Sequence, residues 1–234
     1  MNHLLATIGL APILLAQGSY VVSTIQKLPE PPGEREGVAG EGKPLRLLVL
    51  GDSSAAGVGA PTLDESLLGR VVAGLEATYR VEYKLIARTG ARTRGTLGHL
   101  NKRPEEAFDV VVVALGVNDV AAGRSVSAWS NDLGELVELL RAKFSARYIY
   151  ISGMPPVSSF PALPQPLRWY LGSQAKRYDI ALEAFAESQA DCEHVQLDFP
   201  LERDLMASDM FHPGPRVYAQ WGGDIAERIV EAGR

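Results

Sequence analysis

The stretch Leu45–Ala60, LRLLVLGDSSAAGVGA, joins a short aliphatic run to a turn that is rich in small residues. Its first part, Leu45–Leu50, contains one charged residue, Arg46, and such a run is typical of a buried strand. Glycines follow at positions 51, 57 and 59, and they allow the backbone to turn tightly and to approach a ligand closely. The stretch therefore predicts the first core strand of a sheet, with Ser53 just past its carboxyl end.

Strand and helix patterns alternate along the rest of the chain. The patterns predict further strands over 81–87, 108–115, 147–152 and 194–198, and helices over 66–79, 91–101, 128–144, 167–190 and 215–232. The run 108–115 is almost continuously apolar, as expected of a central parallel strand that is buried on both faces. This alternation predicts an α/β fold with a central parallel sheet of about five strands, in the flavodoxin-like order 2-1-3-4-5.

Composition excludes several classes of function. The net charge of −5, with no basic stripe along the sequence, argues against nucleic acid as a partner. A single cysteine, Cys192, cannot form an internal disulfide. With that one cysteine and four scattered histidines, the chain is not expected to hold a dedicated zinc site.

The first 43 residues differ in composition from the rest of the chain. Residues 4–25 carry no charge and are mostly apolar, and a span of roughly 20 such residues can cross a bilayer. The absence of Lys and Arg from Met1–His3 is unusual for a secretion signal, and Pro12 and Gln17–Ser19 interrupt the apolar run, so a segment that covers the core is the alternative. Residues 27–43 are rich in Pro, Gly and charge, which is typical of an extended linker.

These features predict three parts: an apolar segment over 1–26 that is a signal or membrane-anchor candidate, a linker over 27–43, and the main domain over 44–234. We expect membrane association through residues 4–25. We also expect a location in the cell envelope or outside the cell rather than in the cytoplasm. The sequence leaves the oligomeric state open.

Polar residues that suit nucleophilic catalysis follow several predicted strands. Serine is a poor nucleophile without a base within hydrogen-bond reach. Of the four histidines, only His212 combines a loop position, within 200–214, with a nearby carboxylate, Asp209, three residues earlier. Ser53, His212 and Asp209 therefore predict a nucleophile, a base and an anion that orients the base. The backbone N–H groups of Ser53 and Gly90 and the side-chain amide of Asn118 are candidate donors to an oxyanion.

These motifs together resemble one known family. The blocks Gly51-Asp52-Ser53 with Gly57, Gly90, Gly116-Val117-Asn118-Asp119 and Asp209-Met210-Phe211-His212 match the GDSL, or SGNH, hydrolases in order and spacing. The resemblance covers the chain from about Leu45 onward and departs from the family at Ser54, where many members have leucine. It implies a three-layer α/β/α sandwich, a Ser–His–Asp triad that cleaves esters or thioesters, and no metal or organic cofactor.

The loop 153–166, which is rich in proline, and the segment after it carry large apolar side chains. They predict an apolar wall for an acyl chain, although a loop packed against the sheet edge is the alternative. The candidate wall residues are Met154, Val157, Phe160, Leu163 and Trp169. The resulting hypothesis is a serine esterase for short- to medium-chain acyl esters. Its alternatives are a lysophospholipase or acyl-thioesterase, a carbohydrate O-deacetylase and a non-catalytic binding module.

Overall fold

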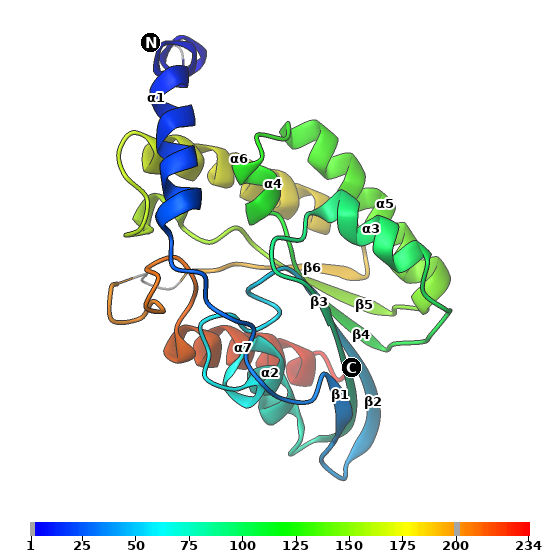
Figure 1. Ribbon diagram of the computed structural model, residues 1–234. Coiled ribbons are helices and arrows are strands. Elements are labelled where there is room, and N and C mark those ends of the chain that lie inside the picture. The colour runs from blue at the N-terminus through cyan, green and yellow to red at the C-terminus, as the bar shows by residue number, and fades with distance from the viewer. Residues whose placement is uncertain (1–2, 199–201) are drawn as a thin grey trace.

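A computed structural model, which describes residues 3–198 and 202–234, contains a sheet of six strands (Figure 1). The strands are β1 (Glu36–Ala39), β2 (Lys43–Gly51), β3 (Tyr79–Ala87), β4 (Val110–Ala114), β5 (Tyr148–Ser152) and β6 (Cys192–Val195). Their order is β1-β3-β2-β4-β5-β6, and all neighbours are parallel except β1 and β3. The five predicted strands thus lie in the predicted order, and β1 adds an antiparallel edge strand that the sequence analysis did not predict.

Strand β1 lies inside the segment 27–43, which the sequence analysis interpreted as a linker with little packing of its own. That expectation is wrong for residues 36–39, because Glu36 pairs with Lys84 and Ala39 pairs with Val81 of β3. The carbonyl of Arg35 also accepts a hydrogen bond from the Leu85 N–H at 2.7 Å. Charged and glycine-rich composition suits an exposed edge strand as well as a linker, so composition alone could not distinguish the two.

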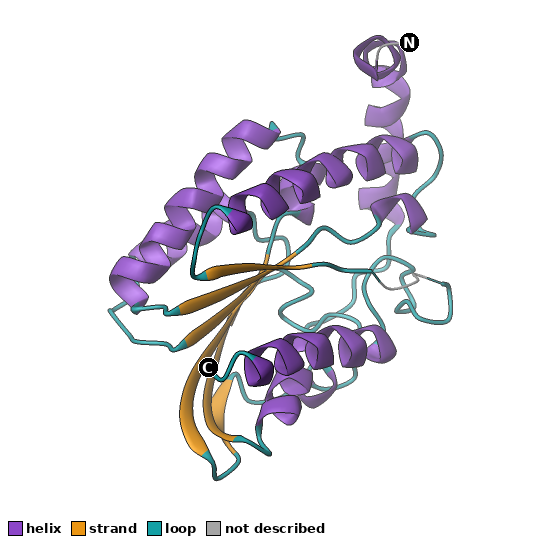
Figure 2. Ribbon diagram, turned by 180° about the vertical axis from the view of Figure 1, so that it is seen from behind, coloured by secondary structure: helices purple, strands orange, loops and turns teal. Residues whose placement is uncertain are grey.

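Helices cover both faces of the sheet, which makes three layers (Figure 2). Helices α2 (Leu67–Leu75) and α7 (Pro215–Glu231) pack together on one face. The other face carries α3 (Thr93–Asn101), α4 (Val117–Ala121), α5 (Val126–Phe144) and α6 (Leu167–Glu187). Short 3₁₀ turns occupy Leu63–Glu65 and Val157–Ser159.

The central strand β4 is buried along its whole length, as its valine run predicts. Parallel strands present their carboxyl ends at one edge of the sheet, and three of the candidate residues follow such ends. Ser53 follows β2, Gly90 follows β3 and Asn118 follows β4. The topology therefore brings these three loops to one side of the molecule. Of the loop expected over 200–214, residues 200 and 201 lie outside the described residues.

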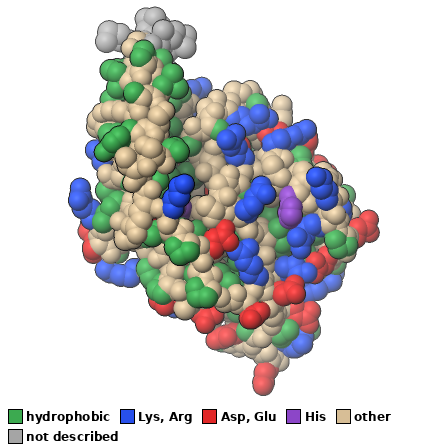
Figure 3. Space-filling model, in the orientation of Figure 1, with side chains coloured by type: hydrophobic (Ala, Val, Ile, Leu, Met, Phe, Trp, Pro, Cys, Tyr) green, Lys and Arg blue, Asp and Glu red, His purple; other side chains and the backbone are tan. Residues whose placement is uncertain are grey.

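The N-terminal segment forms helix α1 (His3–Thr24), which projects from the body of the domain (Figure 1). Its contact with the domain is close to the start of α6: Gln17 Nε2 donates to the Gln165 carbonyl at 2.7 Å, and the Leu167 N–H donates to Gln17 Oε1 at 3.0 Å. Apolar side chains are spread over the described part of this helix among polar atoms (Figure 3), and those exposed include Ile13, Leu15, Tyr20 and Val22.

No helix within the described residues has both the length and the apolar character that crossing a bilayer requires. Met1 and Asn2 of the predicted apolar segment lie outside those residues. Membrane association of residues 4–25 and a location in the envelope stay predictions.

Candidate active site

Ser53, His212 and Asp209 form a continuous chain of hydrogen bonds. His212 Nε2 lies 3.0 Å from Ser53 Oγ, and His212 Nδ1 lies 2.5 Å from Asp209 Oδ2. The carboxylate is fully buried, whereas the imidazole keeps 15% of its side-chain surface exposed. The structure therefore brings Ser53 to the Asp209–His212 pair, which lies far along the chain, in the geometry of a nucleophile, a base and an orienting anion.

The loop that carries His212 is stabilised by the same carboxylate. Asp209 Oδ1 accepts hydrogen bonds from the backbone N–H groups of Phe211 at 3.0 Å and His212 at 2.9 Å. Burial alone would raise the pKa of Asp209, but the hydrogen bonds from the His212 side chain and from the two N–H groups more than offset burial and lower it. Asp209 is thus held ionised, and both of its oxygens are used to place the imidazole.

The loop that carries Ser53 packs directly against the His212 loop. Val58 N–H donates to the Ser53 carbonyl at 2.9 Å, and the buried Tyr218 hydroxyl donates to the Val58 carbonyl at 2.7 Å. Gly59 has a φ of +99°, and a Cβ at this position would lie 2.3 Å from the carbonyl oxygen of Pro213. Only glycine suits both the backbone conformation and this close approach, which sets the spacing between the two loops.

Asp52 connects the Ser53 loop to Asn118. Its Oδ1 accepts from the Ser54 N–H at 3.0 Å and its Oδ2 accepts from Asn118 Nδ2 at 3.1 Å. Burial raises the pKa of Asp52 to about 6, against the opposing effects of these hydrogen bonds and of His212. Asn118 Nδ2 also donates to the Ala91 carbonyl at 3.1 Å, so the amide is held between two loops. The sequence analysis missed the link between Asp52 and Asn118.

Ser53, Asn118 and His212 line a cleft of about 650 Å³, a volume that includes space open to solvent. Its other walls are mainly apolar and come from several loops. They include Leu115, Val117, Pro155, Phe160, Leu197, Met206, Phe211, Pro213 and Trp221. A cleft with apolar walls and a few polar groups at one place suits a ligand with an apolar body and one polar centre.

Of the predicted wall residues, all of which are described, Phe160 is the one that lines the cleft. Met154, Val157 and Leu163 are instead buried in the hydrophobic core. Trp169 lies on α6 with 39% of its surface exposed. Apolar loop residues pack wherever apolar surface is available, and here the loop divides its side chains, with Pro155 and Phe160 at the cleft and the others in the core.

Some of the wall residues that the sequence analysis missed could have been predicted from their position next to a motif. Leu115 and Val117 flank Gly116 in the Asn118 motif, and Phe211 and Pro213 flank His212. Direct neighbours of the motif residues share the loops that form the cleft, so adjacency to the motifs predicts them. Leu197, Met206 and Trp221 lie away from the motifs and carry no such signal.

Gly90 does not line the cleft, although its neighbour Ala91 accepts the hydrogen bond from Asn118. Gly90 is exposed and has a φ of +76°. Within residues 3–198 and 202–234, no group of three or more His, Cys, Asp or Glu side chains is placed to hold a metal ion.

A mostly parallel sheet between two helical layers, with this serine, imidazole and carboxylate at its carboxyl edge, defines a class of hydrolytic enzymes. Residues 49–220 match the GDSL-like lipase/acylhydrolase family, and the chain belongs to that family. No curated protein matches the chain.

Solved structures share the fold at low sequence identity. The psychrotrophic esterase EstA from Pseudoalteromonas sp. has 19% identity and a TM-score of 0.62, over 80% of this chain and 97% of its own. An aryl esterase from M. smegmatis has 16% identity and a TM-score of 0.58, over 80% and 99%. A carbohydrate acetylesterase from Sinorhizobium meliloti has 19% identity and a TM-score of 0.57, over 80% and 99%.

Proposed function

We propose that this protein is a serine esterase that cleaves short- to medium-chain acyl esters through an acyl-enzyme. The observation that carries the proposal is the hydrogen-bonded chain from Ser53 through His212 to Asp209, in which Ser53 and His212 line a mainly apolar cleft. Membership of a lipase/acylhydrolase family supports the same chemistry.

The reaction begins when Ser53 Oγ attacks the ester carbonyl and His212 Nε2 takes its proton. The ionised Asp209 stabilises the imidazolium that forms. His212 then gives the proton to the leaving alkoxide, which departs as an alcohol and leaves the acyl group on Ser53. A water molecule, deprotonated by His212, attacks the acyl-enzyme, and collapse of the second tetrahedral intermediate releases the acid and restores the serine.

The negative charge on the tetrahedral oxygen requires hydrogen-bond donors. In this proposal they are the N–H groups of Ser53 and Gly90 and the Asn118 amide. Asn118 Nδ2 donates its two hydrogens to Asp52 and to the Ala91 carbonyl, so one of these bonds is exchanged when the amide donates to the oxyanion.

The apolar walls favour an acyl or aryl group over a sugar in the cleft. Structural neighbours include an esterase, an aryl esterase and a carbohydrate acetylesterase, so the fold alone does not choose between these substrates. A sugar site would need more polar side chains than the lining offers, because each buried sugar hydroxyl requires a partner. Lysophospholipids and acyl thioesters share the acyl group and differ in the leaving group.

The test of the proposal combines a covalent probe with a substrate panel. A fluorophosphonate probe is expected to label the intact protein at Ser53, as read by peptide mass spectrometry. p-Nitrophenyl esters of graded chain length are expected to give the highest kcat/KM between acetyl and octanoyl. Absence of labelling would favour a binding module, and a higher kcat/KM on acyl-CoA, lysophospholipid or acetylated sugar would favour the corresponding alternative.

Asn118→Ala is expected to lower kcat by about 10²–10³-fold with little change in KM, because the lost donor acts on charge that develops in the transition state. The measurement is steady-state hydrolysis of the best p-nitrophenyl ester. The alanine variant also leaves Asp52 and the Ala91 carbonyl without this partner, so the thermal unfolding midpoint must be recorded beside the rate. An unchanged kcat in a folded variant would remove Asn118 from the oxyanion site.

A further inference from the structure

Residues 26–35, which we call the strap, connect α1 to β1 and run across loops of the active site (Figure 1). In the loop that carries His212, the hydroxyl of Ser208, the residue before Asp209, donates a hydrogen bond to Gln26 Oε1 at 3.2 Å. Near the Ser53 loop, the Pro32 carbonyl accepts from the Leu63 N–H at 3.0 Å. The strap thus contacts the segments around two of the catalytic side chains.

Its third contact is the most extensive and is made by Glu30. Glu30 Oε1 accepts from both the backbone N–H of Thr89, at 3.0 Å, and the Thr89 hydroxyl, at 2.7 Å. Glu30 Oε2 forms an ion pair with Arg35 of the same strap. Arg35 Nη1 in turn donates to the Ala87 carbonyl at the end of β3, at 3.0 Å. The carboxylate and the guanidinium together hold the chain on the way from β3 to Gly90.

These interactions favour the ionised form of Glu30. Burial would raise its pKa, and the hydrogen bonds from Thr89 and the attraction of Arg35 more than offset burial and lower it. We call the two hydrogen bonds from Thr89 to the Glu30 carboxylate the clamp. Hydrogen bonds to a charged acceptor are stronger than those between neutral groups, so the clamp holds Thr89 although these side chains are partly exposed.

The loop is open on the side of Gly90. A Cβ placed on Gly90 would meet no atom within 4 Å, so this residue projects into open space. On its far side Ala91 is held by its N–H to the Arg88 carbonyl, at 3.0 Å, and by Asn118. The peptide that carries the Gly90 N–H therefore lies between two anchors, Glu30 and Asn118.

We propose that Glu30 is a positioning residue that fixes the Thr89–Gly90 peptide so that the Gly90 N–H faces the oxyanion. The proposal rests on the esterase function above, in which Gly90 is a donor. Glu30 touches neither the substrate nor the triad in this account, and its effect passes through Thr89. Since the oxyanion develops in the tetrahedral intermediates and the transition states that flank them, and is absent from the bound ester, removal of Glu30 lowers kcat and leaves KM nearly unchanged.

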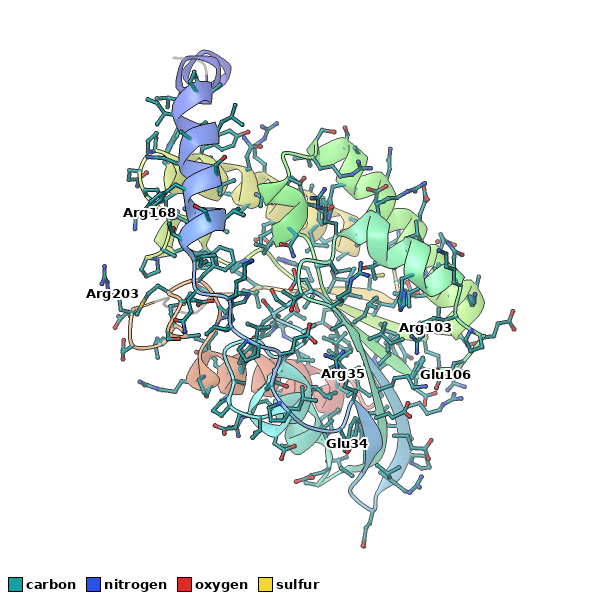
Figure 4. The ribbon with its side chains drawn as sticks, viewed as in Figure 1. Glu34, Arg35, Arg103, Glu106, Arg168 and Arg203 are labelled. Carbon is teal, nitrogen blue, oxygen red and sulfur yellow. The ribbon has the colours of Figure 1, made fainter. Side chains whose placement is uncertain are left out.

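The kinetic test compares three variants of the full chain on a p-nitrophenyl ester. Glu30→Ala should lower kcat by about tenfold to a hundredfold, less than the loss of a whole donor, with KM changed by less than about twofold. Glu30→Gln keeps an acceptor for both Thr89 donors but loses the ion pair with Arg35, so it should restore part of the rate. The matched control is Glu34→Ala, which removes an exposed carboxylate of the same strap near β1 (Figure 4) and should behave as the unchanged protein.

A second readout requires no substrate. Deuterium exchange of the peptide that spans residues 88–91 should become faster in Glu30→Ala than in Glu34→Ala, with exchange elsewhere in the sheet unchanged. Unchanged exchange in this peptide overturns the positioning role whatever the protein hydrolyses. Equal loss of kcat in the Gln and Ala variants, or a KM effect alone, also overturns it. If the unchanged protein cleaves no ester but the exchange differs, the esterase function fails and the clamp stands.

Discussion

Replacing Ser53 by alanine is expected to lower kcat for a chromogenic ester by about 10⁴–10⁶-fold, because no acyl-enzyme can form without the hydroxyl. The residual rate would come from the cleft and the oxyanion donors acting on a water molecule. The fold should survive, since Ser53 N–H and the Ser53 carbonyl remain and the Val58 N–H keeps its acceptor. Steady-state hydrolysis and the thermal unfolding midpoint, recorded on the same preparation, check both statements.

The neighbouring serine provides a matched control for this prediction. Ser54 donates its backbone N–H to Asp52, and Ser54→Ala keeps both that bond and the Ser53–His212 contact. Most of the activity should therefore remain in Ser54→Ala. A folded Ser53→Ala protein with a rate within tenfold of the unchanged chain would contradict the assignment of Ser53 as the nucleophile. Loss of activity in Ser54→Ala alone would indicate that Ser54 is the nucleophile instead.

The arrangement of the core could be predicted from the sequence because buried parallel strands have a recognisable pattern of continuous apolar residues. A buried strand such as Val110–Ala114 is apolar at every position, since helices cover it on both faces. The edge strand Glu36–Ala39 has no such apolar run in its sequence. Its side chains alternate between exposed and half-buried, and its pairing depends on the open edge of Tyr79–Ala87, which lies some 40 residues further along the chain.

The same distinction separates the catalytic residues from the walls of the cleft. Ser53 and Asn118 follow strand ends, and the sheet order alone places them at one edge. An apolar side chain in a loop, such as Leu163, indicates burial without saying against what. Its contacts depend on how the whole loop packs, and in this chain Leu163 packs into the core while Phe160 of the same loop lines the cleft. The clamp of Glu30 on Thr89 joins positions 59 residues apart and has no local pattern at all.

Asp209→Asn is expected to lower kcat by about 10⁴-fold while leaving the loop in place. The amide oxygen of the asparagine can still accept from the N–H groups of Phe211 and His212, as Asp209 Oδ1 does. The amide nitrogen then faces His212 Nδ1 and donates to it, so Nδ1 must lose its hydrogen and Nε2 must carry one. An Nε2 that already carries a hydrogen cannot take the proton of Ser53.

The opposite orientation of the amide would restore the correct imidazole tautomer, but it would leave the two backbone N–H groups facing an NH₂ group. Burial makes an unmet N–H group costly, so the inactive arrangement is favoured. Asp209→Ala removes the acceptor for both N–H groups as well and should unfold at a lower temperature than Asp209→Asn. A lower rate in both variants, with a stability loss mainly in Asp209→Ala, would show that the carboxylate both orients the His212 imidazole and holds the two backbone N–H groups of the loop.

The effect of pH on unfolding provides an independent check of the same residue. The pKa of Asp209 is lowered on folding, so its ionised form stabilises the fold above the pKa of the unfolded chain. That stabilisation is lost as the pH falls through the folded-state pKa. Asp209→Asn has no proton to bind here, so its stability should fall less steeply with acid than that of the unchanged protein. Parallel acid-unfolding curves of the two proteins would contradict a buried ionised Asp209. In the kinetic experiment, a rate of Asp209→Asn within tenfold of the unchanged protein would show that the carboxylate does not orient His212.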